Sequence, residues 1–181
     1  VAIEKKHIFS FILWGPPGVG KTTLARIYAK AINAEYHELS AVSAGKDDIR
    51  KIVEDKQGMA TNLFGPKVLF LDEIHRFNKA QQDFLLPYVE KGVLVLIGAT
   101  TENPSFEVIP ALLSRCRVFV LNELSKEDMR NIVSRTGYTI TKDAVDWLLE
   151  MAGGDARQML AMIENTFQLY GSITTKTLTD T

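Results

Sequence analysis

Eight residues near the start of the chain have the types and spacing of a phosphate-binding loop. They read Gly15-Pro16-Pro17-Gly18-Val19-Gly20-Lys21-Thr22 and match the pattern Gly-x-x-x-x-Gly-Lys-Thr at every fixed position. Glycines, which have no Cβ, let successive backbone N–H groups converge on phosphate oxygens. The lysine can reach the β- and γ-phosphates, and the threonine hydroxyl can ligate Mg²⁺. The octet therefore predicts a site for a nucleoside triphosphate with Mg²⁺.

The flanks of the octet support this prediction. An apolar run, residues 9–14, leads into it, and a helix-like stretch, residues 23–33, follows it. A glycine-rich turn that merely joins a strand to a helix is the alternative. Because a strand before and a helix after are the context of a working phosphate loop, we favour the nucleotide site and count Thr23 among its residues.

Two carboxylates follow another apolar run. Residues 68–71 are succeeded at once by Asp72 and Glu73, which places an acid pair at the C-terminal tip of a predicted strand. We expect Asp72 to hold Mg²⁺, mostly through water, and Glu73 to orient and polarise the attacking water. Two ordinary acids at a solvated strand end are the alternative. The phosphate loop upstream in the same α/β pattern favours the first interpretation.

Polar side chains also end the next predicted strand, and two arginines follow. Thr101 is the first candidate to position the water beside the γ-phosphate, with Thr100 and Asn103 as neighbours. Threonines that simply end a strand are an equally good interpretation of these residues alone.

Arg115 lies just before the last predicted strand, and Arg157 lies at the start of a later helix. Their spacing alone favours surface arginines.

Apolar or β-branched runs alternate with helical patterns over the first two thirds of the chain. The runs are residues 9–14, 36–39, 68–71, 93–97 and 118–121. Near-continuous apolar runs are typical of parallel strands covered on both faces, and the alternation with helices predicts βαβ crossovers. We therefore predict an α/β fold with a five-stranded parallel sheet flanked by helices. The nucleotide would lie outside the carboxyl ends of the strands.

Helical patterns alone fill the last third of the chain. They cover residues 129–133, 144–151 and 159–169, and Ser125 is a plausible N-cap for the first of these helices. We predict a nucleotide-binding domain over residues 1–122 and a small all-helical domain over residues 123–181, with a hinge near residues 122–125. The segments 58–66 and 136–141 are predicted loops.

The composition limits the classes of protein. The chain has 181 residues, of which 46% are hydrophobic, and its formal net charge is −1. This supports a folded core and argues against a protein built as a polycation for nucleic acid. The single cysteine, Cys116, excludes an internal disulfide and a cysteine-based metal site. No apolar run is long enough to predict a membrane span, and Val1 in place of an initiator methionine suggests an excised fragment.

The order of these motifs resembles that of AAA+ ATPases of the clamp-loader clade. Residues 74–83 (Ile-His-Arg-Phe-Asn-Lys-Ala-Gln-Gln-Asp) and 98–107 (Gly-Ala-Thr-Thr-Glu-Asn-Pro-Ser-Phe-Glu) are more specific. They resemble the family of replication-associated recombination protein A and the Werner-helicase-interacting protein. The resemblance runs from about residue 12 to residue 121. It implies a P-loop AAA+ core followed by a helical lid, with ATP as the nucleotide.

The resemblance also implies a role for each candidate residue. The roles are Walker A for Lys21 and Thr22, Walker B for Asp72 and Glu73, sensor 1 for Thr101, an arginine finger for Arg115, and sensor 2 for Arg157. A finger acts on the γ-phosphate of a neighbouring subunit, where it stabilises charge on the transferred group. Hydrolysis is thus expected to need a ring-like homo-oligomer. In the family a C-terminal domain forms a tetramer; it would follow Thr181, so we expect the lid to be truncated here.

The best local candidate for DNA contact is the predicted helix that carries Lys46, Arg50 and Lys51, where the first two lie one turn apart. Binding there would be directed at phosphates, and hence sensitive to salt and insensitive to base sequence. A solvated charged face is the alternative, because Asp47 and Asp48 offset the charge.

From the resemblance, the expected partners are single-stranded or forked DNA and replisome or single-stranded-DNA-binding proteins, with no membrane. The expected location is the bacterial cytoplasm beside the nucleoid, or the nucleus if the source is eukaryotic.

Three functions are compatible with these residues. The resemblance favours a DNA-stimulated ATPase that acts in replication-fork maintenance, recombination and repair. A clamp-loader subunit or a Holliday-junction branch-migration ATPase is a second enzyme interpretation. A switch that binds ATP and hydrolyses little is an alternative of another class. Glu73 argues against the switch, because a pure sensor does not need a water-activating acid.

Overall fold

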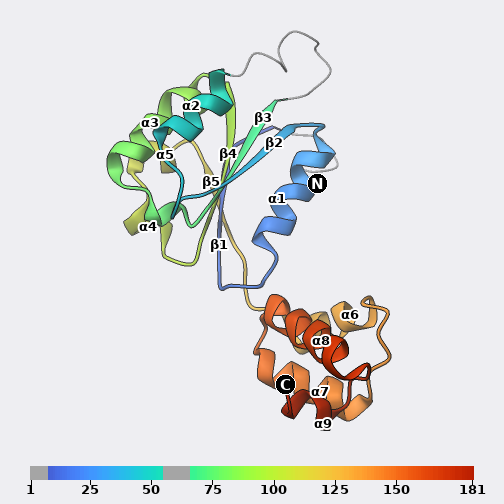
Figure 1. Ribbon diagram of the computed structural model, residues 1–181. Helices are drawn as coiled ribbons and strands as arrows, with labels where there is room; N and C mark the ends of the chain where they lie inside the picture. The colour runs from blue at the N-terminus through green and yellow to red at the C-terminus, as the bar shows by residue number, and fades with distance from the viewer. Residues whose placement is uncertain (1–7, 55–65) are drawn as a thin grey trace. The chain divides into compact units, whose positions relative to one another are not determined.

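The computed structural model describes residues 8–54 and 66–181, which form two units (Figure 1). The sheet unit includes Lys21–Leu121, and the helical unit joins Pro16–Gly20 to Asn122–Thr181. The predicted loop at 58–66 falls almost entirely outside the described residues. No helix among the described residues is long and apolar enough to cross a membrane.

The sheet unit is built on a parallel sheet. Its strands are β1 Phe11–Trp14, β2 Glu35–Ser40, β3 Lys67–Asp72, β4 Leu94–Thr100 and β5 Arg117–Val120. They form a five-stranded sheet in the order β2-β3-β4-β1-β5, and every pairing is parallel. The predicted α/β class and the predicted five-stranded sheet are therefore confirmed. Because the strands run in one direction, the polar residues that end β3 and β4 lie at the same edge.

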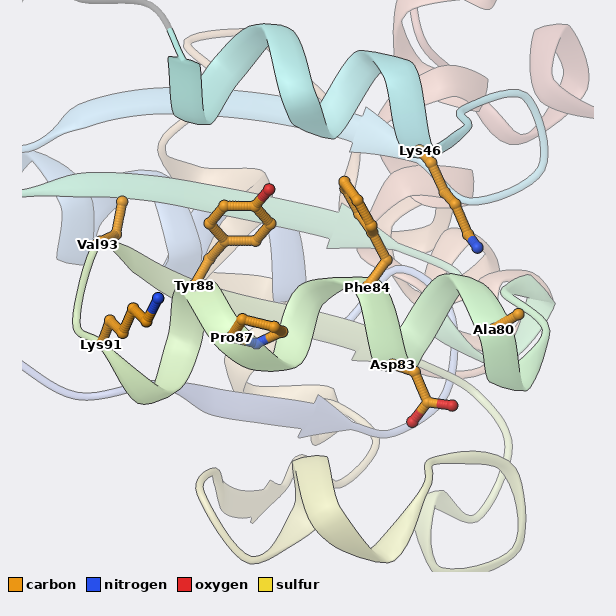
Figure 2. Close-up of a pocket in the computed structure, with 8 residues that line it drawn as sticks. All are labelled: Lys46, Ala80, Asp83, Phe84, Pro87, Tyr88, Lys91 and Val93. Atoms are coloured by element: carbon orange, nitrogen blue, oxygen red, sulfur yellow. The ribbon is translucent and has the colours of Figure 1, made fainter.

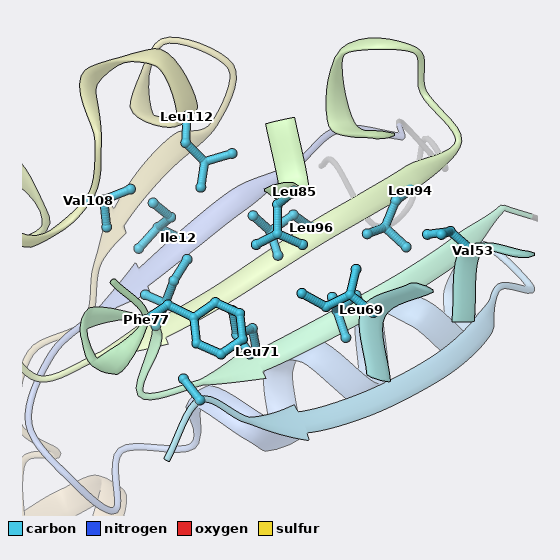
Figure 3. Packing of buried hydrophobic residues seen from close by; sticks show 13 residues of the cluster. Ile12, Val53, Leu69, Leu71, Phe77, Leu85, Leu94, Leu96, Val108 and Leu112 are labelled. Carbon is cyan, nitrogen blue, oxygen red and sulfur yellow. The ribbon is translucent and has the colours of Figure 1, made fainter. Parts of the chain in front are cut away.

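Helices cover both faces of this sheet. They are α1 Lys21–Ala31, α2 Lys46–Glu54, the 3₁₀ turn η1 Ile74–Arg76, α3 Lys79–Glu90, α4 Pro104–Glu107 and α5 Pro110–Leu113. Helix α1 packs on one face and α2 and α3 on the other (Figure 1). Residues of β3 alternate between the faces: Leu69 and Leu71 pack under α3 (Figure 3), whereas Val68 and Phe70 pack under α1. Burial on both faces explains why β3 and β4 read as continuous apolar runs.

The helical unit has its own core. Its helices are α6 Lys126–Ser134, α7 Lys142–Ala152, α8 Ala156–Tyr170 and α9 Thr175–Thr179. Ser125 caps α6 as predicted, because its Oγ accepts a hydrogen bond of 3.1 Å from the Asp128 N–H and the Asp128 carboxylate accepts one from the Ser125 N–H. Met129, Leu148, Met159 and Ile163 are fully or almost fully buried between the helices. The predicted loop at 136–141 is confirmed except at its end, where Ile140 bridges to Ile173.

Gln82 is a buried polar residue that ties α3 to the segment leading toward Arg115. Its Nε2 donates to the carbonyl oxygens of Phe77 and Glu107, both at 2.9 Å, and its Oε1 accepts from the Ile109 N–H at 2.9 Å. The side chain is only 1% exposed. One glutamine thus satisfies backbone groups just before α3 and around the C-terminal end of α4.

We predict that Gln82→Leu destabilises the protein strongly. The substitution leaves three backbone groups without their partner, and each buried unsatisfied group costs about 1–3 kcal/mol. The expected loss in the free energy of unfolding, measured by urea denaturation, is therefore about 3 kcal/mol or more. The control is Asp83→Ala on the exposed side of the same helix, which should stay within about 0.5 kcal/mol. Equal stability of the two variants would contradict the assigned role of Gln82.

Candidate functional site

The phosphate loop begins at the carboxyl edge of the sheet. The Gly15 N–H donates to the carbonyl oxygen of Thr100 at 3.1 Å, and a Cβ at position 15 would collide with the carbonyl oxygen of Leu121. Only glycine fits between these two strand ends. The Lys21 Nζ donates to the Gly15 carbonyl oxygen at 2.8 Å, across the loop. Helix α1 begins at Lys21, so its N-terminal N–H groups open toward the loop.

Residues 16–20 pack within the helical unit. The Ala156 N–H donates to the carbonyl oxygen of Gly18 at 3.3 Å, and a Cβ on Gly18 would collide with the carboxylate of Asp155. Gly18 also has a left-handed backbone, with φ of 68°. Close approach and conformation both demand glycine at this position. Arg157 is exposed in the first turn of α8.

The acid pair lies where β3 ends. Asp72 is the last residue of β3, and Glu73 follows it with φ of 55° and ψ of 43°. A left-handed conformation is uncommon for a residue other than glycine, and such residues concentrate at functional sites. The Glu73 N–H donates to Asp72 Oδ1 at 3.1 Å. The chain thus turns sharply at Glu73, directly after β3 ends at Asp72.

A buried histidine connects Glu73 to the tip of β4. His75 Nε2 lies 3.1 Å from Glu73 Oε2, and His75 Nδ1 lies 3.0 Å from Thr100 Oγ1. The His75 side chain is 8% exposed and Thr100 is fully buried. Thr101, the predicted sensor, is exposed just beyond the strand, while Asn103 caps α4 by accepting from the Ser105 N–H. The contact between His75 and Thr100 joins residues 25 apart in the chain and has no signal in the sequence.

Arg115 is anchored on the sheet unit. Its Nη2 forms an ion pair with Glu90 at the end of α3, and its Nη1 donates to the Ala111 carbonyl oxygen at 2.7 Å and to Ser114 Oγ at 2.9 Å. The side chain is still 39% exposed. A guanidinium that is both held and accessible suits contact with a group outside this chain.

The cations proposed for DNA contact differ in their partners. Arg50 pairs with Asp47 at 2.6 Å and Lys51 pairs with Asp48 at 3.3 Å. Lys46 has no carboxylate partner among the described residues, and its Nζ lies 5.9 Å from the ring centre of Phe84. A groove of about 580 Å³ opens here beside α3 (Figure 2). It is lined by Lys46, Ala80, Asp83, Phe84, Pro87, Tyr88, Lys91 and Val93.

The oxygen ligands of the site fit Mg²⁺. Thr22 offers a hydroxyl and Asp72 a carboxylate, which are the hard donors that this ion prefers. No group of three or more His, Cys, Asp or Glu side chains could hold a metal within residues 8–54 and 66–181. Mg²⁺ does not need such a cage, because it is commonly bound through one or two protein oxygens, water and substrate phosphates.

Comparisons with known proteins give consistent results. The family described as "ATPase family associated with various cellular activities (AAA)" matches residues 11–124. ATPase WRNIP1 of Dictyostelium discoideum is 48% identical over 172 residues, covering 89% of this chain and 19% of that protein. Replication-associated recombination protein A of Escherichia coli K12 is 44% identical over 174 residues, covering 90% of this chain and 39% of that protein. The chain thus spans well under half the length of these relatives.

A solved structure extends the likeness to both units. The structure of the RuvB Holliday junction branch migration motor of Thermotoga maritima matches with a TM-score of 0.71 and 25% identity. The match covers 99% of this chain and 63% of that one. The match therefore includes both the sheet and the helices that follow it.

We predict that Cys116, next to Arg115, is unreactive in the folded protein. Burial raises the pKa of its thiol from 9.0 to about 12, and the thiolate is the reactive form. At pH 8, alkylation by iodoacetamide should be at least about 100-fold slower in the folded protein than in guanidinium. The chain has one cysteine, so mass spectrometry reports this site alone. Equal rates in the two states would show that the segment carrying Arg115 is not packed as described.

Proposed function

Because the chain belongs to the AAA family of ATPases, and its sequence groups it with replication-associated recombination protein A and WRNIP1, we propose that it hydrolyses ATP in replication-fork maintenance, recombination and repair of DNA. One observation supports hydrolysis above all others. The start of the phosphate loop, the acid pair and the tip of β4 lie at one edge of the sheet, connected by hydrogen bonds through Thr100 and His75. A site that only bound nucleotide would not need Glu73 there.

The residues divide the reaction between them. Backbone N–H groups of the loop and Lys21 bind the phosphates, and Thr22 with Asp72 would hold Mg²⁺. The bound ion would offset negative charge on the phosphate oxygens. Glu73 orients a water molecule and takes its proton as the water oxygen bonds to the γ-phosphorus and the bond to the ADP oxygen breaks. Thr101 is proposed to hold that water in place, since it follows directly on Thr100 at the strand tip.

The two arginines are proposed to act on different nucleotides. Arg157, on the helical domain of residues 123–181, would contact the nucleotide bound to the domain of residues 1–122. Arg115 would reach the γ-phosphate of the next subunit in a homo-oligomer, for which its anchored and exposed position is suited. The family resemblance suggests a ring-like tetramer. It also suggests replisome or single-stranded-DNA-binding proteins as partners, in the cytoplasm beside the nucleoid of a bacterium.

A branch-migration motor is the second candidate function. The likeness to the RuvB motor covers 99% of the chain. The identity is 25% in that case, against 44% and 48% for the two relatives named above. The sequence likeness therefore favours the first proposal, and a clamp-loader subunit has no comparable support.

We predict that Glu73→Gln abolishes turnover but not nucleotide binding. Loss of a general base lowers the rate by about 10²–10⁴-fold, whereas the amide keeps the size of the side chain. Phosphate release should be measured with and without single-stranded or forked DNA, and ATP affinity with a fluorescent analogue. Glu164→Gln, on the exposed face of α8, serves as the control. Tight binding without turnover in the unaltered protein would support the binding switch instead.

We predict that Arg115→Ala lowers turnover by about 10³-fold or more, since an arginine finger contributes roughly 10³–10⁵ in rate. ATP affinity should change little, because the finger serves another subunit's nucleotide. Mixing Arg115→Ala with Lys21→Ala subunits should restore part of the activity, as the latter supply the arginine and the former an intact loop. Arg117→Ala is the matched control two residues away. Mixtures that stay inactive would contradict action in trans.

We predict that Lys46→Glu combined with Arg50→Glu weakens DNA binding by about 10-fold or more at low salt, because contacts to phosphates release counterions. The loss should shrink as salt is raised. Lys30→Glu, on α1 at the opposite face of the sheet, controls for a charge reversal elsewhere on the surface. Fluorescence anisotropy with labelled oligonucleotides measures the affinity. If all variants bind alike, the DNA contacts lie elsewhere.

A further inference from the structure

Both ring nitrogens of His75 are engaged, one by Glu73 and one by Thr100. The donors in this chain of contacts follow from the chemistry of each group. An ionised carboxylate only accepts hydrogen bonds, so His75 Nε2 donates to Glu73 Oε2 at 3.1 Å. In a neutral imidazole the other nitrogen is then an acceptor. With the imidazole neutral, the contact of 3.0 Å is a hydrogen bond that Thr100 Oγ1 donates to His75 Nδ1.

The Thr100 hydroxyl also forms hydrogen bonds with the backbone that follows β4. Its oxygen accepts from the Glu102 N–H at 2.9 Å, and Glu102 directly follows the predicted sensor Thr101. Among the described residues, the Glu102 carbonyl oxygen, at 3.2 Å, competes with His75 Nδ1 for the single proton of this hydroxyl. The contacts thus run from the backbone beyond Thr101, through Thr100 and His75, to one oxygen of Glu73. The Glu73 side chain is 34% exposed, so water can reach it while His75 holds one of its oxygens.

From this geometry we propose that His75 is a positioning residue for ATP hydrolysis. It holds the carboxylate of Glu73 in one rotamer and couples that rotamer to the tip of β4. The left-handed backbone of Glu73 aims the side chain, and the imidazole N–H stops it from rotating away. The inference rests on the proposed role of Glu73 as the base. It assigns to Thr100 the task of setting the tautomer and orientation of the histidine.

The first test compares variants that keep or remove each hydrogen bond. His75→Leu removes both contacts, whereas His75→Gln keeps an amide donor for Glu73. We expect His75→Leu to lower kcat by about 10–100-fold, the usual effect of losing a group that orients an active residue. ATP affinity should stay within about threefold, and His75→Gln should recover most of the loss. His37→Leu, at a histidine whose Nε2 also contacts a glutamate, at 2.8 Å, should leave kcat unchanged.

The second test separates positioning from a packing defect. Thr100→Val keeps the shape of the side chain but removes the hydroxyl, and should lower kcat, whereas Thr100→Ser should not. In the Glu73→Gln background, His75→Leu should cause no further loss, since the two residues act as a unit. An unchanged kcat in His75→Leu overturns the proposal. So does an equal loss in the Glu73→Gln background, or a rise in the ATP dissociation constant that matches the fall in kcat.

A third measurement does not depend on activity. Nitrogen-15 NMR of the imidazole rings should show His75 protonated at Nε2 and unprotonated at Nδ1, with this preference weakened in Thr100→Val. Protonation at Nδ1 alone would overturn the donor assignment.

The outcomes also separate this inference from the proposed function. If Glu73→Gln keeps full turnover, the role of Glu73 fails; if Glu73→Gln is inactive but His75→Leu is normal, only the role of His75 fails.

Discussion

The candidate site depends on the position of Thr100, the residue of β4 that pairs in parallel with Trp14 of β1. Its carbonyl oxygen accepts from the Gly15 N–H, which fixes the start of the phosphate loop. Its hydroxyl contacts His75, which connects it to the acid pair. Thr100 is the last residue of β4 and is fully buried. One strand end thus sets the position of Gly15, where the loop starts, and of His75 beside Glu73, and neither can shift without breaking a hydrogen bond to Thr100.

The rigidity of this strand end comes from the layers around it. Strand β4 is buried along its whole length, between β3 and β1 and under helices on both faces. Close-packed interiors resist small displacements, because each side chain fills its own volume. The loop itself gains its shape differently, through glycines that accept close approach or a left-handed backbone. The stiff sheet edge therefore fixes Gly15, where the loop begins, and Gly18 gives the loop a backbone conformation that other residues rarely adopt.

The sequence predicted those features that depend on neighbours in the chain. The phosphate loop, the acid pair and the strands are local patterns, and the sheet confirms the strands to within a few residues. Residues 9 and 10 proved to lie outside β1, which begins at Phe11; the Oγ of Ser10 accepts from the Leu96 N–H at 2.9 Å. Contacts that depend on strand order were not predictable. Neither the His75 bond to Thr100 nor the Arg115 pair with Glu90 has a signal in spacing, since each joins residues about 25 apart.

The anchoring of Arg115 bears on how such a residue could serve another subunit. A guanidinium has five N–H donors, and the contacts to Glu90, Ala111 and Ser114 occupy only part of them. Donors are left over for a phosphate while the side chain stays fixed, so little rotamer entropy is lost on contact. Glu90 is the last residue of α3, where a negative charge is disfavoured by the helix dipole. Its ion pair with Arg115 offsets that cost, which explains a carboxylate at this position and holds the guanidinium in place.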